Sequence, residues 1–168
     1  MEERWDIYNA DKQLTGRTMI RDDWHMEPGD YHLTVLGVIR RPDGRFLITQ
    51  RVLTKSWAAG CWEVPGGACV AGETSLEAVK REISEETGID VSDAPGELVF
   101  TYRRDNPDEG DNYFVDVYRF EKDIKESDVK LQEEESADFD FATHDQIRAL
   151  AESGRFLHYD SIKNVFCN

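Results

Sequence analysis

Three glutamates, Glu82, Glu85 and Glu86, are spaced so that a single helix would carry them on one face. Residues at i, i+3 and i+4 are neighbours on a helix surface, and like charges there repel by roughly 0.2–0.5 kcal/mol per pair. Such a cluster is stabilised when a cation binds to it. Because these ligands are all carboxylates, with no Cys or His among them, the pattern favours Mg²⁺, with Mn²⁺ as a substitute, over zinc.

A magnesium ion held by carboxylates is usually completed by water and by substrate phosphates. A small diphosphate substrate that reached this helix would therefore be held through the metal, and a metal-bound water could be activated for attack on phosphorus. Glu82 is the candidate for a metal ligand that also orients or deprotonates this water. Arg81 lies four residues after Glu77 and four before Glu85. We expect it to orient these acids as an ion-pair partner.

The helix that carries the cluster has recognisable ends. Thr74 and Glu77 have the spacing of a capping box, which predicts a helix start just after Glu73, and Gly88 predicts its end. We expect Glu73 to support the loop and the start of the helix. The expected buried face has helical spacing and consists of Leu76, Val79 and Ile83.

The helix is part of a longer pattern from Gly67 to Ile89, which reads GACVAGETSLEAVKREISEETGI. Glycines, acids, one arginine and aliphatic residues occupy nine positions at fixed spacing. Since each residue type has a usage of about 5%, a chance match at every position is very improbable. The stretch resembles the Nudix box, the signature of enzymes that cleave diphosphate bonds in nucleoside diphosphates linked to another group.

The resemblance to the Nudix family implies further site residues. In that family the carbonyl at the position of Gly66 commonly completes the metal site, and Gly67 lies in the tight loop that meets the substrate. Many members also supply a distal glutamate to the metals or to the attacking water. Glu135 fits this place best, Glu134 is the neighbouring alternative, and a solvated acidic loop is the ordinary interpretation of both.

The N-terminal half also resembles Nudix proteins related to isopentenyl-diphosphate isomerase. The likeness lies in the segments WDIYNADKQLTGR, YHLTVLGVIRRPDGRFLITQR and TKSWAAGCWEVPGG. Arg51 and Lys55 stand at the positions of the isomerase's diphosphate-binding pair, so we expect both to bind substrate. His25 and His32 stand at two of its metal-binding positions. We favour ordinary roles for them, an exposed loop residue and a packed strand residue, over a second metal site.

The rest of the isomerase site is absent from the sequence. Gly66 replaces the catalytic cysteine, Ala68 replaces the third metal-binding histidine, and Tyr113 lies near the place of the second acid. The main prediction is therefore a Mg²⁺-dependent Nudix pyrophosphohydrolase. An isomerase and a non-catalytic Nudix-like ligand-binding module are the alternatives.

Nothing in the sequence names the substrate. Nucleotide sugars, CDP-alcohols, nucleoside di- and triphosphates and prenyl diphosphates all fit the pattern. Trp57 and Trp62 flank the approach to the glycine loop, where an aromatic ring can stack on a base, although core packing is the commoner role. Arg103 and Arg104 are either substrate-facing cations or exposed surface residues.

Length and composition predict a single domain over residues 1–168, with about residues 1–30 packed on it as an N-terminal extension. A polar N-terminus and the lack of an apolar run of about 18 residues predict a cytoplasmic protein with no membrane partner. The net charge of −15 argues against binding to long nucleic acid. Three cysteines without paired spacing predict no disulfide framework and no zinc site.

The remaining pattern predicts an α/β fold in which a mixed β-sheet is sandwiched between α-helices, as the Nudix resemblance also implies. A homodimer is the assembly that this family likeness suggests. The expected strands cover 32–40 and 45–51, paired as a hairpin, then 97–104, 112–120 and 138–141, and the expected later helices cover 143–151 and 158–166.

Overall fold

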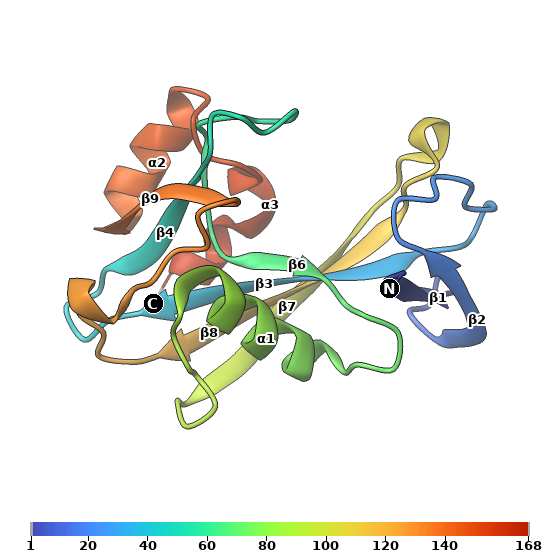
Figure 1. Ribbon diagram of the computed structural model, residues 1–168, viewed down its shortest axis with the longest axis horizontal. Helices are drawn as coiled ribbons and strands as arrows, with labels where there is room; N and C mark the ends of the chain where they lie inside the picture. The colour runs from blue at the N-terminus through green and yellow to red at the C-terminus, as the bar shows by residue number, and fades with distance from the viewer. Residues whose placement is uncertain (1, 168) are drawn as a thin grey trace.

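A mixed seven-stranded sheet forms the centre of the computed structural model, which describes residues 2–167 (Figure 1). The strand order is β5-β4-β3-β8-β7, with β6 beside β3 and β9 beside β4. Among the strand pairs formed by residues 2–167, only β3 and β8 run parallel. The strands are β3 (His32–Arg40), β4 (Phe46–Arg51), β5 (Trp62–Glu63), β6 (Gly66–Ala68), β7 (Gly96–Arg104), β8 (Tyr113–Glu121) and β9 (Ser136–Ala142).

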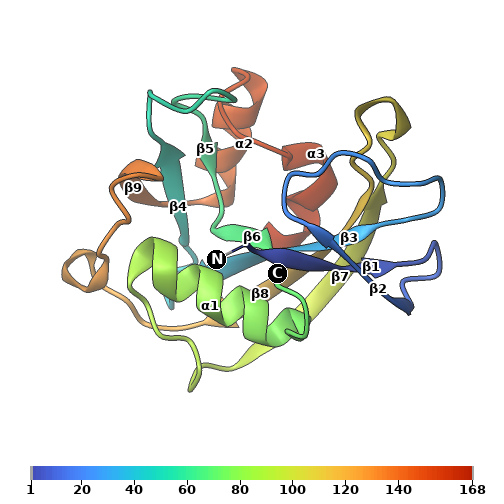
Figure 2. The ribbon, with the colours of Figure 1, turned by 45° about the vertical axis from the view of Figure 1, so that its right-hand side comes forward.

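Helices cover both faces of this sheet (Figure 2). Helix α1 (Ser75–Thr87) packs on one face, while α2 (His144–Glu152) and α3 (Tyr159–Ile162) pack on the other. Neighbouring residues of β3 alternate between the two sides, with Val35 in the α1 core and Val38 in the α2–α3 core. The predicted α/β sandwich is therefore confirmed.

Several predicted elements have different extents or partners in the structure. The hairpin of β3 and β4 pairs at one position only, Arg40 with Phe46, because β3 then pairs with β6 and β8 while β4 pairs with β5 and β9. The predicted helix over 158–166 is split into α3 and a 3₁₀ turn, Lys163–Phe166. Among residues 2–167, no helix has the length and apolar character needed to cross a bilayer.

The N-terminal extension forms a β-hairpin of its own, which the sequence analysis did not predict. Strands β1 (Arg4–Tyr8) and β2 (Leu14–Ile20) pair antiparallel as a separate sheet. The hairpin is anchored by a buried ring, since Trp5 stacks on His32 of β3 with ring centroids 4.2 Å apart. Lys12 adds an ion pair to buried Asp116 of β8 at 2.8 Å.

Helix α1 begins and ends where its sequence predicts. Thr74 is the N-cap, and its hydroxyl accepts a hydrogen bond from the Glu77 amide at 3.1 Å. Gly88 ends the helix with a left-handed φ of 74°. The prediction that Leu76 is buried is wrong, because this residue lies in the first turn, where its side chain is left 42% exposed. Ala78 joins Val79 and Ile83 in the buried face instead.

A glycine allows α1 to lie close to the sheet. A β-carbon added to Gly37 of β3 would lie 2.5 Å from Ile83 Cδ1 and 2.7 Å from Val79 Cγ2. Both of these side chains are fully buried, so neither can turn away without disturbing the core. Gly37 therefore sets the spacing between α1 and β3.

We expect Gly37→Ala to destabilise the protein by about 1–3 kcal/mol, because the added methyl group overpacks the core beneath α1. Urea unfolding measures the effect. Ser84→Ala, on the exposed side of the same helix, serves as the matched control and should change stability by less than about 0.5 kcal/mol. Equal stabilities for Gly37→Ala and wild type would contradict the role given to this glycine.

Candidate active site

A cavity of about 370 Å³ lies between α1, the glycine strand β6, the segment from β4 to β5, and residues 132–136. Every residue to which the sequence analysis assigned a catalytic, metal-binding or substrate-binding role lines it. These residues are Arg51, Lys55, Gly66, Gly67, Arg81, Glu82, Glu85, Glu86 and Glu135. The structure thus brings the predicted set together, while the role of each member stays a prediction.

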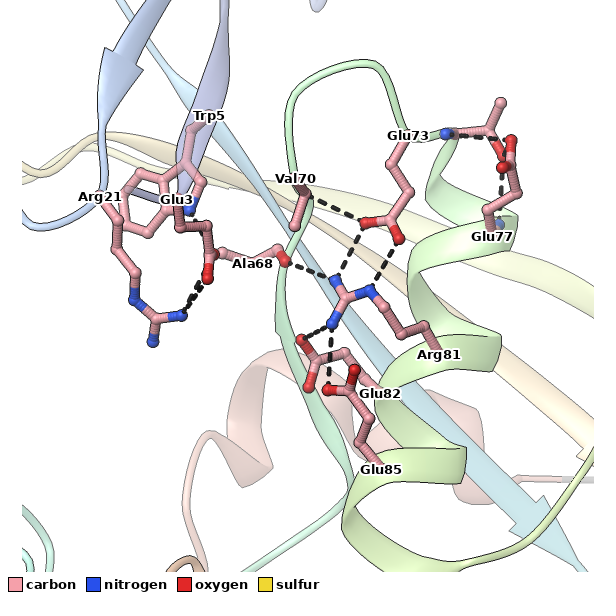
Figure 3. A network of polar contacts seen from close by, with 11 residues as sticks. Glu3, Trp5, Arg21, Ala68, Val70, Glu73, Glu77, Arg81, Glu82 and Glu85 are labelled. Atoms are coloured by element: carbon pink, nitrogen blue, oxygen red, sulfur yellow. Dashed lines mark hydrogen bonds and ion pairs between the residues drawn. The ribbon is translucent and has the colours of Figure 1, made fainter. Parts of the chain in front are cut away.

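Arg81 holds the acids of α1 in a network (Figure 3). Its guanidinium donates to Glu73 through Nε at 2.7 Å and Nη2 at 3.0 Å. Its Nη1 donates to Glu82 at 2.9 Å and to Glu85 at 3.3 Å. The expected pair with Glu77 is not formed, because that carboxylate turns to the N-cap and accepts a hydrogen bond from the Thr74 hydroxyl at 2.9 Å.

Glu73 occupies the place in this network that Glu77 was expected to take. Besides binding Arg81, it accepts a hydrogen bond from the Val70 amide at 3.0 Å, so it ties the loop before the helix to α1. Arg81 also donates to the Ala68 carbonyl at 3.2 Å. One guanidinium therefore fixes the glycine strand, the loop and the acidic face of the helix relative to one another.

Two glutamates of the cavity have pKa values above the ordinary range. Burial raises the pKa of Glu86 well above its usual value, and the nearby carboxylates of Glu82 and Glu63 raise it further. The Gly66 amide, 3.4 Å from Glu86 Oε2, offers weak compensation. Burial also raises the pKa of Glu82, and the charge of Arg81 opposes that shift.

The chemistry of these donors fits a hard divalent cation. Glu82 and Glu86 are enclosed carboxyl groups whose ionised forms lack enough positive charge around them, and Glu85 lies beside them on the same helix face. Among residues 2–167, however, no three His, Cys, Asp or Glu side chains are grouped as a metal site. Arg81 draws Glu82 and Glu85 toward itself, so the two carboxylates would have to turn for joint coordination.

Basic side chains form the opposite wall of the cavity. Arg51 Nη1 lies 3.1 Å from Glu63 Oε2, and Lys55 forms an ion pair with Glu135. Of the two distal acids considered, Glu135 lines the cavity, whereas Glu134 is exposed and does not. The geometry therefore favours Glu135 as the distal glutamate.

The cavity also contains residues that the sequence analysis missed. Glu63 is the most prominent, and burial raises its pKa despite the charge of Arg51. Glu63 could have been recognised as a candidate site residue from the sequence, since it is a lone charged residue in the strand that precedes the glycine loop. Glu3 and Arg21 had no such signal, because only the pairing of β1 with β2 brings them to the cavity wall. The remaining missed residues are Ala68, Gln132 and Ser136.

Both histidines adopt the ordinary roles that we favoured. His32 is 5% exposed, and its Nε2 lies 2.9 Å from Asp111 Oδ1. His25 is exposed in a loop and contacts Asp23. His25 is thus an exposed loop residue and His32 a packed strand residue, as expected, while the lack of a second metal site stays a prediction.

The two tryptophans and the cysteines lie outside the acidic cavity. Trp57 is 59% exposed, and the Arg51 guanidinium lies 5.3 Å from the centre of its ring. Trp62 packs against the α2–α3 core. Cys61, Cys69 and Cys167 are free thiols, and burial raises the pKa of Cys69 to about 12.

The raised pKa of Glu86 gives a prediction for the protein freed of metal by chelation. The pKa of Glu86 is higher in the folded state than in the unfolded state. At pH values between these two pKa values the folded state binds more protons, so its stability falls as pH rises through this range. Glu86→Gln removes the buried charge, so we expect this variant to be roughly 1–3 kcal/mol more stable than wild type near pH 8 in EDTA. It should also lose much of the decline in stability that wild type shows as pH rises above the ordinary range of glutamate.

Urea unfolding across this pH range makes the measurement. Glu85→Gln is the matched control, because Glu85 is exposed on the same helix. A decline for Glu86→Gln as steep as that of wild type would show that the buried carboxyl is not its source.

Sequence comparison identifies relatives over nearly the whole chain. The NUDIX domain family matches residues 30–165. The chain is 35% identical over 165 residues to an uncharacterized Nudix hydrolase of Listeria monocytogenes, with 98% of this chain and 94% of the relative covered. Over 72 residues it is 43% identical to an 8-oxo-dGTP diphosphatase of Proteus vulgaris, with 43% of this chain and 62% of the relative covered.

Solved structures share the fold. A crystal structure of a Deinococcus radiodurans protein superposes with a TM-score of 0.76 at 22% identity and covers 97% of both chains. A MutT protein from Methanosarcina mazei superposes with a TM-score of 0.63 at 25% identity, covering 81% of this chain and 90% of that protein. The Nudix-box residues on α1 and the match over residues 30–165 together establish that this chain belongs to the Nudix hydrolase family and is a pyrophosphohydrolase.

Proposed function

We propose that this protein is a Mg²⁺-dependent pyrophosphohydrolase that cleaves a diphosphate bond in a nucleoside diphosphate derivative or a related diphosphate. One observation carries the proposal: the acids of α1 and the cations Arg51 and Lys55 line the same 370 Å³ cavity. A diphosphate needs positive charge near both of its phosphates: Arg51 and Lys55 would supply it on one side, and a cation held by the acids of α1 would supply it on the other.

Glu82, Glu85, Glu86 and the Gly66 carbonyl are the groups that would hold the ion. When bound, Mg²⁺ supplies charge compensation for the diphosphate and increases the acidity of the attacking water, and Mn²⁺ can replace it. Glu82 would accept the proton of that water, because its pKa is already raised by burial and a base works best with a pKa near the operating pH.

Arg51, Lys55 and Gly67 would bind the substrate. Each basic side chain is already paired with a cavity carboxylate, Arg51 with Glu63 and Lys55 with Glu135. An incoming phosphate would compete for these contacts, and it would free Glu135 to approach the metal or the attacking water. Gly67 lets the backbone of β6 lie close to the Glu82 carboxylate, because a β-carbon there would lie 2.5 Å from Glu82 Oε1.

Arg81 would position the acids and not bind the substrate. Its nitrogens are occupied by Glu73, Glu82, Glu85 and the Ala68 carbonyl. Metal binding by Glu82 and Glu85 would relieve part of this network. The contact with Glu73 would then keep the guanidinium in place.

We also propose that the chain belongs to the subgroup of Nudix proteins related to isopentenyl-diphosphate isomerase. Isomerase activity nevertheless has less support than hydrolysis. The nearest thiol to the glycine strand is Cys69, and burial raises its pKa to about 12. Its side chain packs in the α1 core and does not line the cavity. A non-catalytic role does not account for the retention of every acid in the box.

A substrate panel tests the function. Nucleotide sugars, CDP-alcohols, nucleoside di- and triphosphates and prenyl diphosphates would each be incubated with Mg²⁺, with Mn²⁺ and with EDTA. Mass spectrometry of the products in ¹⁸O-labelled water would identify the bond cleaved and the phosphorus attacked. We expect metal-dependent cleavage of a nucleoside diphosphate derivative. Binding without cleavage of any member would contradict the proposal.

Substitution of the proposed base gives a second test. We expect Glu82→Gln to lower kcat by about 10²–10⁴-fold with the fold intact, because the carboxylate that takes the proton is lost. Glu77→Gln on the same helix is the matched control. It faces the N-cap and not the cavity, and Gln also serves in a capping box, so its kcat should stay near that of wild type. A Glu82→Gln enzyme with wild-type turnover would refute this assignment.

A further inference from the structure

The loop between β4 and β5 carries an exposed aromatic ring beside the active-site cavity. This ring belongs to Trp57, whose side chain is 59% exposed. Arg51, at the end of β4, and Lys55, two residues before the tryptophan, both line the cavity. The Arg51 guanidinium lies 5.3 Å from the centre of the Trp57 ring. The ring is therefore at the edge of the cavity, one side chain away from the place where the diphosphate would lie.

Backbone contacts hold this loop in a closed shape. The Arg51 amide donates to the Cys61 carbonyl at 2.9 Å, and the Gly60 amide donates to the Arg51 carbonyl at 3.1 Å. Directly after Trp57, Ala58 has a φ of 53°, in the left-handed region that residues other than glycine seldom adopt. Strain of this kind is often found at ligand sites. The loop thus fixes the position of an exposed ring.

Arg51 joins this ring to the cavity. Its Nε donates to the Trp57 carbonyl at 3.2 Å and its Nη1 to Glu63 at 3.1 Å, so the guanidinium is held over the ring. Although the His158 ring also lies 6.1 Å from that of Trp57, more than half of the tryptophan side chain stays exposed. Aromatic rings and arginine planes are the surfaces on which proteins stack nucleobases. A base on Trp57 would lie next to the cation that we expect to bind its phosphate.

The lining of the cavity favours a base over a prenyl chain as the group attached to the diphosphate. Among residues 2–167, Ala68 is the one apolar side chain that lines it, apart from the two glycines. A prenyl chain gains affinity by leaving water for an enclosed apolar site, which this lining does not provide. A planar base needs only a ring surface and can keep its polar edge in water. Since Trp62 packs against the α2–α3 core, Trp57 is the tryptophan that offers such a surface.

We propose that Trp57 is the base-binding platform of this enzyme, on which the base of a nucleoside diphosphate derivative stacks while the diphosphate lies in the active-site cavity. The inference rests on the proposed function and narrows it to diphosphates that carry a nucleoside. Trp57 contacts the substrate away from the reacting phosphorus. Its removal should therefore weaken binding of the nucleoside and leave binding of the diphosphate unchanged.

Two kinds of non-hydrolysable probe separate these contributions. The α,β-methylene diphosphates of adenosine, guanosine, cytidine and uridine carry a base, whereas methylenediphosphonate carries the same two phosphorus groups alone. Dissociation constants would be measured by calorimetry on the full chain with Mg²⁺ present. We expect wild type to bind at least one of the four nucleotides about tenfold or more tightly than methylenediphosphonate, the size of effect that base stacking produces.

Substitutions in the loop then test the platform. Trp57→Ala should weaken binding of the preferred nucleotide by about 5- to 150-fold, because the stacking surface is lost. Its affinity for methylenediphosphonate should stay within about twofold of wild type, since the diphosphate keeps its contacts. Trp57→Phe keeps an aromatic face and should give an intermediate loss. Leu53→Ala is the matched control, because Leu53 is 80% exposed in the same loop, and it should bind both probes like wild type.

The outcomes separate this inference from the proposed function. An unchanged affinity of Trp57→Ala for the nucleotide, or an equal loss for both probes, would overturn the platform while the hydrolase assignment stands. An equal loss in Leu53→Ala would also contradict stacking, because it would indicate general apolar contact. Cleavage of prenyl but not nucleoside members of the substrate panel would overturn the inference without affecting metal-dependent hydrolysis. If wild type binds neither probe and cleaves no diphosphate in the panel, both proposals fail.

Discussion

The close packing of α1 on β3 and on the glycine strand sets the position of the acidic groups in the active-site cavity. Two glycines make it possible, because a β-carbon at Gly37 would meet Ile83 and one at Gly67 would meet the Glu82 carboxylate. The register between β3 and β6, in which Val35 pairs with Gly67, fixes the glycine strand against the same strand that supports the helix. Backbone pairing and core packing thus determine where the acidic face of α1 lies.

This packing concentrates charge in a small enclosed space. Six carboxylates and four basic groups line the 370 Å³ cavity. Arg81, Arg51 and Lys55 each pair with carboxylates, yet the pKa values of Glu63, Glu82 and Glu86 remain raised because burial outweighs the available positive charge. A site of this kind is well suited to a divalent cation and an anionic substrate, which together can replace the internal ion pairs without a large change in net charge.

The elements around α1 have separate tasks. The helix and β6 carry the groups of the Nudix box, and the N-terminal hairpin extends the cavity wall with Glu3 and Arg21, outside the residues that the family match covers. The active-site cavity thus combines the helix and glycine strand of the family signature with residues from outside the family match.

Much of this molecule could be predicted from local sequence patterns. The capping residue Thr74, the terminal glycine Gly88 and the spacing of Val79 and Ile83 define α1 without reference to the rest of the chain, and the same spacing places its three glutamates on one face. Alternation and turn residues located most strands, because a strand's two faces differ in burial. The family resemblance then connected Arg51, Lys55 and Glu135 to that helix, although they are distant in sequence.

Contacts between distant segments decided the rest. Sequence spacing predicted Glu77 as the partner of Arg81, but the Glu77 carboxylate accepts a hydrogen bond from Thr74 in the capping box. Arg81 binds Glu73 of the preceding loop instead. The positions of Arg103 and Arg104 were likewise decided by the tertiary structure, in which Arg104 lines a cavity beside α2 and α3 whereas Arg103 pairs with Asp105. Helical periodicity and capping depend on interactions over a few residues, so the sequence alone determines them. The partner of a long charged side chain depends instead on which surfaces the tertiary structure brings within its reach.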